Sequence, residues 1–77
     1  MDEGIMFEIV EHLGVLSTTA AGWTTELNMV SWNGRPPIFD IRKWSPDHGK
    51  CSKGLTFKDF ELFKLAEIIE KYKEVEH

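Results

Sequence analysis

The sequence predicts an α+β domain in which several strands precede one C-terminal helix. Residues 5–44 alternate apolar and polar side chains between turn signals, which is typical of strands. Residues 57–75 instead repeat apolar side chains at helical spacing. The length of 77 residues suits one small domain with a thin stability margin. We therefore expect residues 1–77 to form a single unit.

The strands are predicted from apolar runs and the turns between them. Residues 5–17 are rich in Ile, Phe, Val and Leu, and a break near Glu11 and His12 indicates a bend. Residues 23–32 form the second predicted strand, and the following Asn33-Gly34 pair is a strong signal for a two-residue hairpin. Because Pro36 and Pro37 lack amide donors, they belong at the start of the third strand or at a sheet edge.

The helix is predicted from an apolar stripe, with its start near Thr56 or Lys58. Thr56 followed by Asp59 resembles a capping box, and Lys58 is the alternative flanking residue. At 100° per residue, Phe60 and Phe63 fall on the side opposite the main apolar arc. We expect these two rings to pair helices in a dimer. The alternative is that curvature or a shifted start brings one ring into the core. The main arc contains Phe57, Leu62, Leu65, Ile68, Ile69 and Tyr72.

The net charge of −4 hides a basic middle segment. Residues 34–58 hold six of the nine Lys and Arg residues, whereas both flanks are acidic. A local basic cluster can bind phosphate because salt screens more distant charges beyond about 8 Å. Alternatively, the segment only balances its acidic flanks. Its basic residues are Arg35, Arg42, Lys43, Lys50, Lys53 and Lys58.

Strand alternation places aromatic and polar side chains on one predicted sheet face. Asn28 and Trp32 share a face of the second strand, and Arg42 and Trp44 share a face of the third. The opposite face of the third strand, which carries Phe39, resembles a core. Single-stranded nucleic acid favours aromatic and basic groups together, since bases stack on rings at ~1–3 kcal/mol each. The alternative is that both tryptophans pack inside the domain.

Other functions have little support in the sequence. The single Cys51 excludes an internal disulfide, and three scattered histidines do not have zinc-ligand spacing, so we expect no cofactor. Cys51 and His48 lie in a polar turn without a third orienting group, so we do not expect an enzyme. No apolar run approaches the ~20 residues of a membrane span. We expect a cytoplasmic protein without a membrane partner, in which the final residue, His77, belongs to an added tail.

Several motifs together give the chain a family resemblance. They are Trp23, Glu26-Leu27-Asn28, Val30-Ser31-Trp32-Asn33, Asp40-Ile41-Arg42-Lys43-Trp44-Ser45-Pro46-Asp47-His48, and Lys53-Gly54-Leu55-Thr56 leading into the helix. With these motifs the chain resembles the single-stranded-DNA-binding domain of the coactivator positive cofactor four, and in particular its short bacterial YdbC-like branch. The resemblance covers nearly the whole chain.

The resemblance implies a strongly curved, four-stranded antiparallel sheet followed by one helix. It also implies a homodimer paired through the helices, with single strands bound in adjoining sheet grooves. In this comparison Arg42 matches the family arginine on the sheet, Trp44 the base-stacking tryptophan, and Lys53 the lysine that meets phosphate. The predicted nucleic-acid-binding residues are Trp23, Asn28, Trp32, Arg35, Arg42, Lys43, Trp44 and Lys53, and the predicted dimer residues are Phe60 and Phe63.

Two departures from the family modify these expectations. Compared with the eukaryotic form, one fewer residue separates Arg42 from Trp44, and the first strand lacks Lys and Arg. We therefore expect binding that depends more on stacking and less on salt. Partners would be single-stranded DNA, melted duplex or RNA, in a nucleoid-associated transcription coactivator or a replication or repair protein. The alternative is a module that docks on RNA polymerase or replication proteins through Phe60, Phe63 or the acidic helix face.

Overall fold

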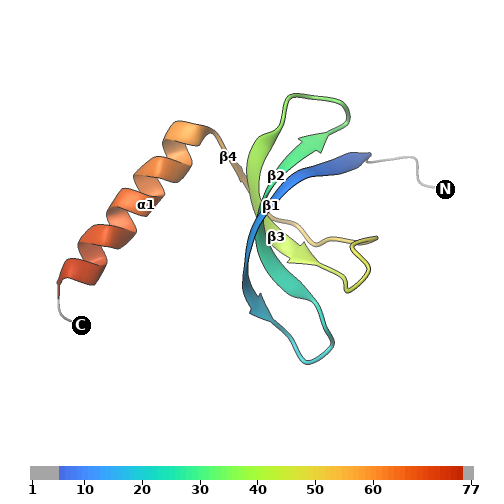
Figure 1. The fold of residues 1–77 in the computed structure, drawn as a ribbon, viewed down its shortest axis with the longest axis horizontal. Helices are drawn as coiled ribbons and strands as arrows, with labels where there is room; N and C mark the ends of the chain where they lie inside the picture. The colour runs from blue at the N-terminus through green and yellow to red at the C-terminus, as the bar shows by residue number, and fades with distance from the viewer. Residues whose placement is uncertain (1–5, 76–77) are drawn as a thin grey trace.

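The computed structural model describes residues 6–75, which form a four-stranded sheet followed by one helix (Figure 1). All neighbouring strands are antiparallel, and the sheet order is β1-β2-β3-β4. This architecture confirms the predicted α+β class and the order of its elements. His77 lies outside the described residues. The elements are β1 (Phe7–Thr18), β2 (Thr24–Trp32), β3 (Ile38–Trp44), β4 (Leu55–Phe57) and α1 (Asp59–Glu74).

The predicted bend in the first strand takes the form of three irregularities in the pairing of β1 with β2. Register shifts occur between Ile9 and Glu11, between His12 and Gly14, and between Val15 and Ser17. Each shift places an extra residue in β1, which bends that strand and increases its twist. The sheet therefore curls, and β1 follows a bent path along its edge (Figure 1).

The Asn33-Gly34 turn forms as predicted, but it does not set the register of β2 with β3. Both residues have positive φ, 53° and 77°, and the Arg35 N–H donates to the Trp32 carbonyl at 2.9 Å. A two-residue hairpin would place Val30 opposite Pro37, whereas Val30 pairs with Ile38. The connection therefore holds one extra residue on the β3 side, at Pro36 and Pro37, which lack the N–H needed for ladder pairing.

Gly54 allows the chain to return against β3 before entering β4. A Cβ atom at this position would collide with the Ile41 carbonyl oxygen and the Arg42 Cβ. The Lys-Gly-Leu-Thr turn therefore needs glycine because another backbone passes too closely for any side chain. β4 then pairs with β3 over three residues, from Leu55 opposite Ile41 to Phe57 opposite Phe39.

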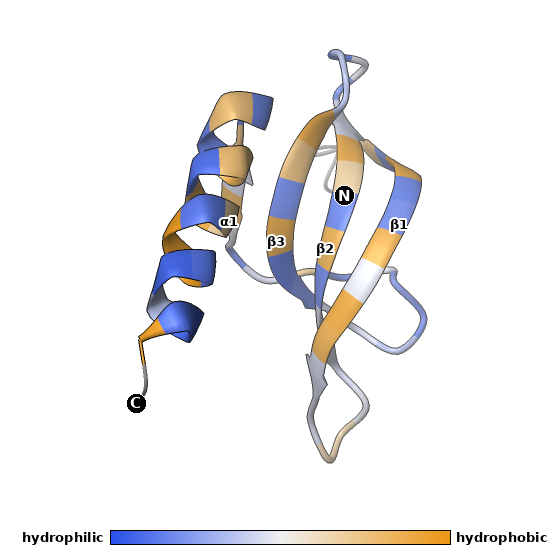
Figure 2. Ribbon diagram, turned by 60° about the vertical axis from the view of Figure 1, so that its left-hand side comes forward, coloured by the Kyte–Doolittle hydropathy of each residue, from blue (hydrophilic) through white to orange (hydrophobic). Residues whose placement is uncertain are grey.

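The helix begins after Lys58, so the proposed Thr56 cap is wrong because Thr56 lies in β4. Glu61 stabilises the first turn by accepting a hydrogen bond from the Lys58 N–H at 2.8 Å. The helix leads away from the sheet, and its ribbon shows separate hydrophobic and hydrophilic faces (Figures 1 and 2). Its contacts with the sheet are made to β3 and β4.

The two sheet faces have the predicted composition but not the predicted burial. Glu26, Asn28 and Asp40 are buried on the same face as Trp44, which was expected to be open for binding. Phe39 and Ile41 lie on the opposite face, which was expected to be the core, and both remain partly exposed. The expectation was wrong because the sheet curls around the first face and the helix does not fully cover the second.

Candidate functional site

The face that carries Trp44 is concave, because the last residue of β2 and the last residue of β3, which lie at opposite ends of the ladder, meet across it. Trp44 pairs with Thr24 at the start of β2, whereas Trp32 ends that strand, about 26 Å away along an extended chain. The two indole centroids are nevertheless only 6.5 Å apart, with their planes at 14°. We call this surface the concave face and define it by Glu26, Asn28, Val30, Trp32, Asp40, Arg42 and Trp44.

Trp44 is the centre of an aromatic cluster and has no exposed surface. Its ring lies 5.0 Å from that of Phe7 and 5.7 Å from that of His48, measured between centroids. An open ring for base stacking, expected for Trp44, is therefore not present in this conformation. Trp32, in contrast to Trp44, is partly exposed to solvent. The alternative interpretation, in which the tryptophans pack inside the domain, holds for Trp44.

Arg42 is held in place by a buried carboxylate instead of projecting into solvent. Its Nε lies 2.8 and 2.9 Å from the two Asp40 carboxylate oxygens, and its Nη2 lies 2.7 Å from Oδ2. Nη1 donates to the Ser52 carbonyl at 3.1 Å, and the guanidinium lies 4.4 Å from the Trp32 ring centroid. Burial alone lowers the pKa of Arg42, but the hydrogen bonds and charge of Asp40 outweigh burial and raise this pKa. Arg42 is therefore charged and lies against the Trp32 ring.

A second buried carboxylate, Glu26, joins two histidines that the sequence did not assign to the site. Its Oε2 lies 2.8 Å from His48 Nε2, and its Oε1 lies 3.5 Å from His12 Nδ1. Asn28 donates to Oε1 at 3.0 Å, and the Thr24 hydroxyl donates to Oε2. Burial raises the pKa of Glu26, but the hydrogen bonds from these neighbours and from His48 outweigh burial and lower it. Glu26 is therefore ionised at neutral pH.

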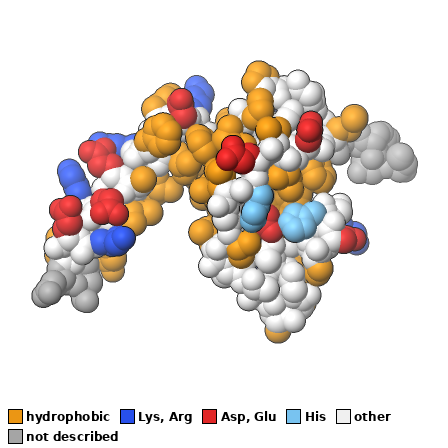
Figure 3. Space-filling model, in the orientation of Figure 1, with side chains coloured by type: hydrophobic (Ala, Val, Ile, Leu, Met, Phe, Trp, Pro, Cys, Tyr) orange, Lys and Arg blue, Asp and Glu red, His pale blue; other side chains and the backbone are white. Residues whose placement is uncertain are grey.

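The histidines are the exposed part of this cluster, with 53% of the His12 side chain and 41% of the His48 side chain accessible. Figure 3 shows the two described histidines side by side on one face, with hydrophobic side chains around them. His12 was missed because the irregularities of β1 hide which of its residues face inward. His48 was missed because it reaches Glu26 from a turn, where its own φ is +59°.

The remaining predicted binding residues lie at the edge of the concave face or beyond it. Lys43 is exposed on β3, Lys53 is exposed before β4, and Arg35 is exposed after the Asn33-Gly34 turn. Trp23 is partly buried before β2, where its backbone N–H donates to the Thr19 hydroxyl at 3.1 Å. Asn28 is completely buried in the Glu26 network. The structure therefore brings together Asn28, Trp32, Arg42 and Trp44, whereas Lys43 alternates with Arg42 and Trp44 and lies on the opposite face of β3.

The opposite side of the sheet carries an apolar groove of about 520 Å³ beside the helix. Phe63 lies in this groove, with its ring 6.2 Å from that of Phe39. Phe63 therefore faces the sheet, although it is not buried in a core as the alternative required. Phe60 and Phe63 nevertheless remain 64% and 62% exposed. The groove is lined by Leu16, Leu27, Ile41, Leu62, Phe63, Leu65, Ala66 and Ile69.

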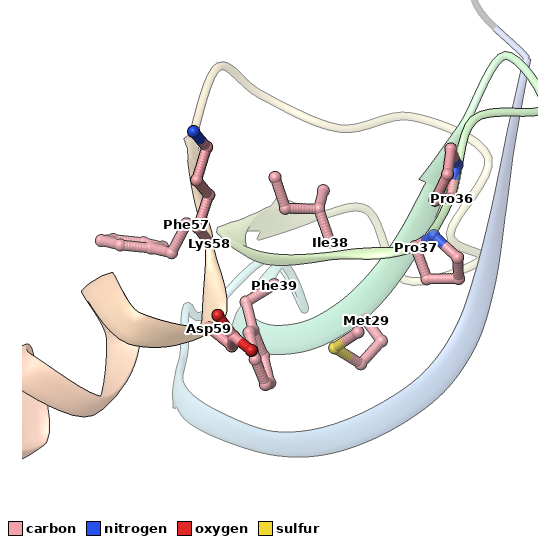
Figure 4. Close-up of a pocket in the computed structure, with 8 residues that line it drawn as sticks. All are labelled: Met29, Pro36, Pro37, Ile38, Phe39, Phe57, Lys58 and Asp59. Atoms are coloured by element: carbon pink, nitrogen blue, oxygen red, sulfur yellow. The ribbon is translucent and has the colours of Figure 1, made fainter.

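A smaller hollow of about 390 Å³ lies where the β2–β3 connection approaches the start of the helix (Figure 4). Its walls are mainly apolar, and Lys58 and Asp59 are its charged residues. It contains none of the predicted binding residues.

Within residues 6–75, no cluster of three or more His, Cys, Asp or Glu side chains is arranged to hold a metal ion. No helix among these residues has the length and apolar character needed to cross a membrane.

Comparison with known proteins gives a relative but no functional assignment. No family model matches the chain. An uncharacterized protein of Treponema pallidum (strain Nichols) is 41% identical over 69 residues, which are 90% of this chain and 81% of that protein. This identity extends over most of both sequences. The chain therefore belongs to the same family as the Treponema pallidum protein.

Proposed function

We propose that this chain binds single-stranded nucleic acid across the mouth of the concave face, with little sequence preference. One observation carries the proposal: the curled sheet gathers aromatic rings, a guanidinium and two half-exposed imidazoles on one face. Stacking surfaces and hydrogen-bonding groups in one place suit unpaired bases, and cations nearby suit the phosphates that follow them. The likeness to the positive cofactor four family supports the same function.

The division of roles differs from the one expected from sequence. Trp32, braced by Arg42, supplies the partly exposed ring against which a base can stack. Trp44 and Asn28 are buried beneath the surface and support it. Lys53 and Arg35 are exposed near Arg42 and Trp32, where they can follow the backbone of a bound strand, whereas Lys43 lies on the opposite face of β3. Such binding would serve transcription, replication or repair at the nucleoid.

We further propose that two copies of the chain pair through their helices. Val30 and Trp44 are the only buried apolar side chains among residues 6–75. Much of α1 is apolar yet exposed, and the groove beside it is lined by apolar side chains. A small domain must bury most of its apolar surface to be stable. A second copy that covers the exposed helix and the groove accounts for both features.

Binding is tested by the fluorescence anisotropy of a labelled thymine oligonucleotide of about 20 nucleotides, at low and moderate salt. Lys53→Ala should weaken binding several-fold and reduce the salt slope by about 0.7, the value for one phosphate contact on a single strand. Lys71→Ala, which removes the same charge from the exposed face of the helix, is the matched control and should bind as the native protein does. No anisotropy change with native protein, even at low salt, would refute the proposal.

The second candidate function is a protein-interaction module, which the exposure of Phe60 favours. This ring is 64% exposed and lies 6.0 Å from Lys58 Nζ at the start of the helix. A partner from the transcription or replication machinery could dock there without any contact to the concave face. Failure of oligonucleotide binding together with a stable dimer would favour this function.

A further inference from the structure

We propose that His12 and His48 contact the phosphates of the bound strand in their charged form, so that affinity rises as pH falls. This inference rests on the proposed function and assigns it two residues and a regulation that the sequence did not indicate.

The hydrogen bonds fix which nitrogen of each ring carries a proton. Asn28 donates through Nδ2 to Glu26, so its Oδ1 is free to accept, and His12 Nδ1 at 2.7 Å must be the donor. Glu26 is ionised and can only accept, so His48 Nε2 at 2.8 Å is also a donor. In the neutral rings the other nitrogen is an acceptor, which cannot bind phosphate oxygen. Protonation converts it into a donor that can.

The charges around the rings explain why protonation matters for a polyanion. On β1, Glu8 and Glu11 pair with Ser31 and Met29, residues of the opposite sheet face, and so point away from the side of His12. On β3, Asp40 and Arg42 compensate each other. In the turn after β3, Asp47 is kept ionised because hydrogen bonds from the Gly49 amide and the Ser45 hydroxyl lower its pKa, and Lys50 lies nearby. The charges of Asp47 and Lys50 therefore also balance each other. With both histidines neutral, Glu26 therefore leaves one uncompensated negative charge beneath the face.

Proton uptake reverses the sign of the charge at this surface. One charged histidine neutralises Glu26, and the second gives the face a net positive charge. A phosphate at the surface stabilises both imidazolium groups further, so binding and protonation reinforce each other. In addition, 53% of the His12 side chain and 41% of the His48 side chain are accessible to a ligand. His12 and His48 can thus supply basic contacts in place of the Lys and Arg side chains that β1 lacks.

The main test compares binding of the labelled thymine oligonucleotide at pH 6 and pH 8, at constant ionic strength. The native protein should bind about tenfold more tightly at pH 6. Its salt slope should also steepen by up to about 1.4, since each phosphate contact on a single strand contributes ~0.7. The double variant His12→Gln, His48→Gln should lose both effects. His77→Gln removes the remaining histidine of the chain and should keep them.

A second measurement needs no variant. Calorimetric titration of native protein near pH 7, in two buffers of different ionisation enthalpy, should show net proton uptake on binding. Binding without proton uptake, or with equal affinity at pH 6 and pH 8, overturns the role of the histidines and leaves the proposed function intact. No binding at either pH overturns both proposals.

Discussion

Replacing Asp40 by Asn tests whether the concave face is a closed core or an open binding groove. Asp40 is completely buried and holds Arg42 through two nitrogen atoms at 2.7 to 2.9 Å. Asp40→Asn keeps the size of the side chain but removes its charge, so the guanidinium loses its counter-ion. Because the Arg42 side chain is only 14% exposed, water can replace that counter-ion only in part.

The expected loss of stability follows from the burial of the pair. Removing one partner of a buried ion pair costs about 3–5 kcal/mol, and the remaining exposure of Arg42 favours the lower end, about 3 kcal/mol. A chain of 77 residues has a total stability of roughly 4–12 kcal/mol. With a urea m-value of ~1–3 kcal/mol/M, the unfolding midpoint should fall by about 1–3 M.

The assay is urea unfolding followed by tryptophan fluorescence, at one fixed protein concentration because the proposed dimer makes stability concentration-dependent. Glu67→Gln is the control, since it removes the same charge from an exposed pair, in which Lys64 Nζ lies 3.3 Å from Glu67 Oε1. That change should cost less than about 0.5 kcal/mol. If Asp40→Asn costs no more than this control, the pair is solvated and Arg42 is available to phosphate, as the sequence predicted.

Three further predictions concern packing, pH and assembly. Gly54→Ala should destabilise the protein by about 1–3 kcal/mol in urea unfolding because its Cβ meets β3 backbone, whereas Gly14→Ala, with no atom within 4 Å of the new Cβ, should cost far less. The lowered pKa of Glu26 contributes stability above its ordinary value of 4.5, which is lost as pH falls through the folded-state value. Thermal unfolding from pH 6 to pH 3 should show this loss, and Glu26→Gln should remove that part of the pH dependence. Phe63→Asp should convert the proposed dimer to monomer in sedimentation velocity; an unchanged sedimentation coefficient would exclude the helix face as the interface.

The sequence by itself determined the elements and the composition of each sheet face. Alternation along β2 and β3 placed Trp32, Arg42 and Trp44 together because side chains in strands alternate with a period of two residues. The Asn33-Gly34 turn and the C-terminal helix were equally readable, since both depend on local residue preferences.

Only the tertiary structure decided what each face does. Register shifts in β1 curl the sheet until Trp32 at the end of β2 meets Trp44 at the end of β3, and this curvature buries Trp44. It also brings His12 and His48, 36 positions apart in the sequence, to the two oxygens of one carboxylate. Alternation specifies which side a residue faces but not how tightly that side closes, because closure depends on bulges and strand pairing between distant residues.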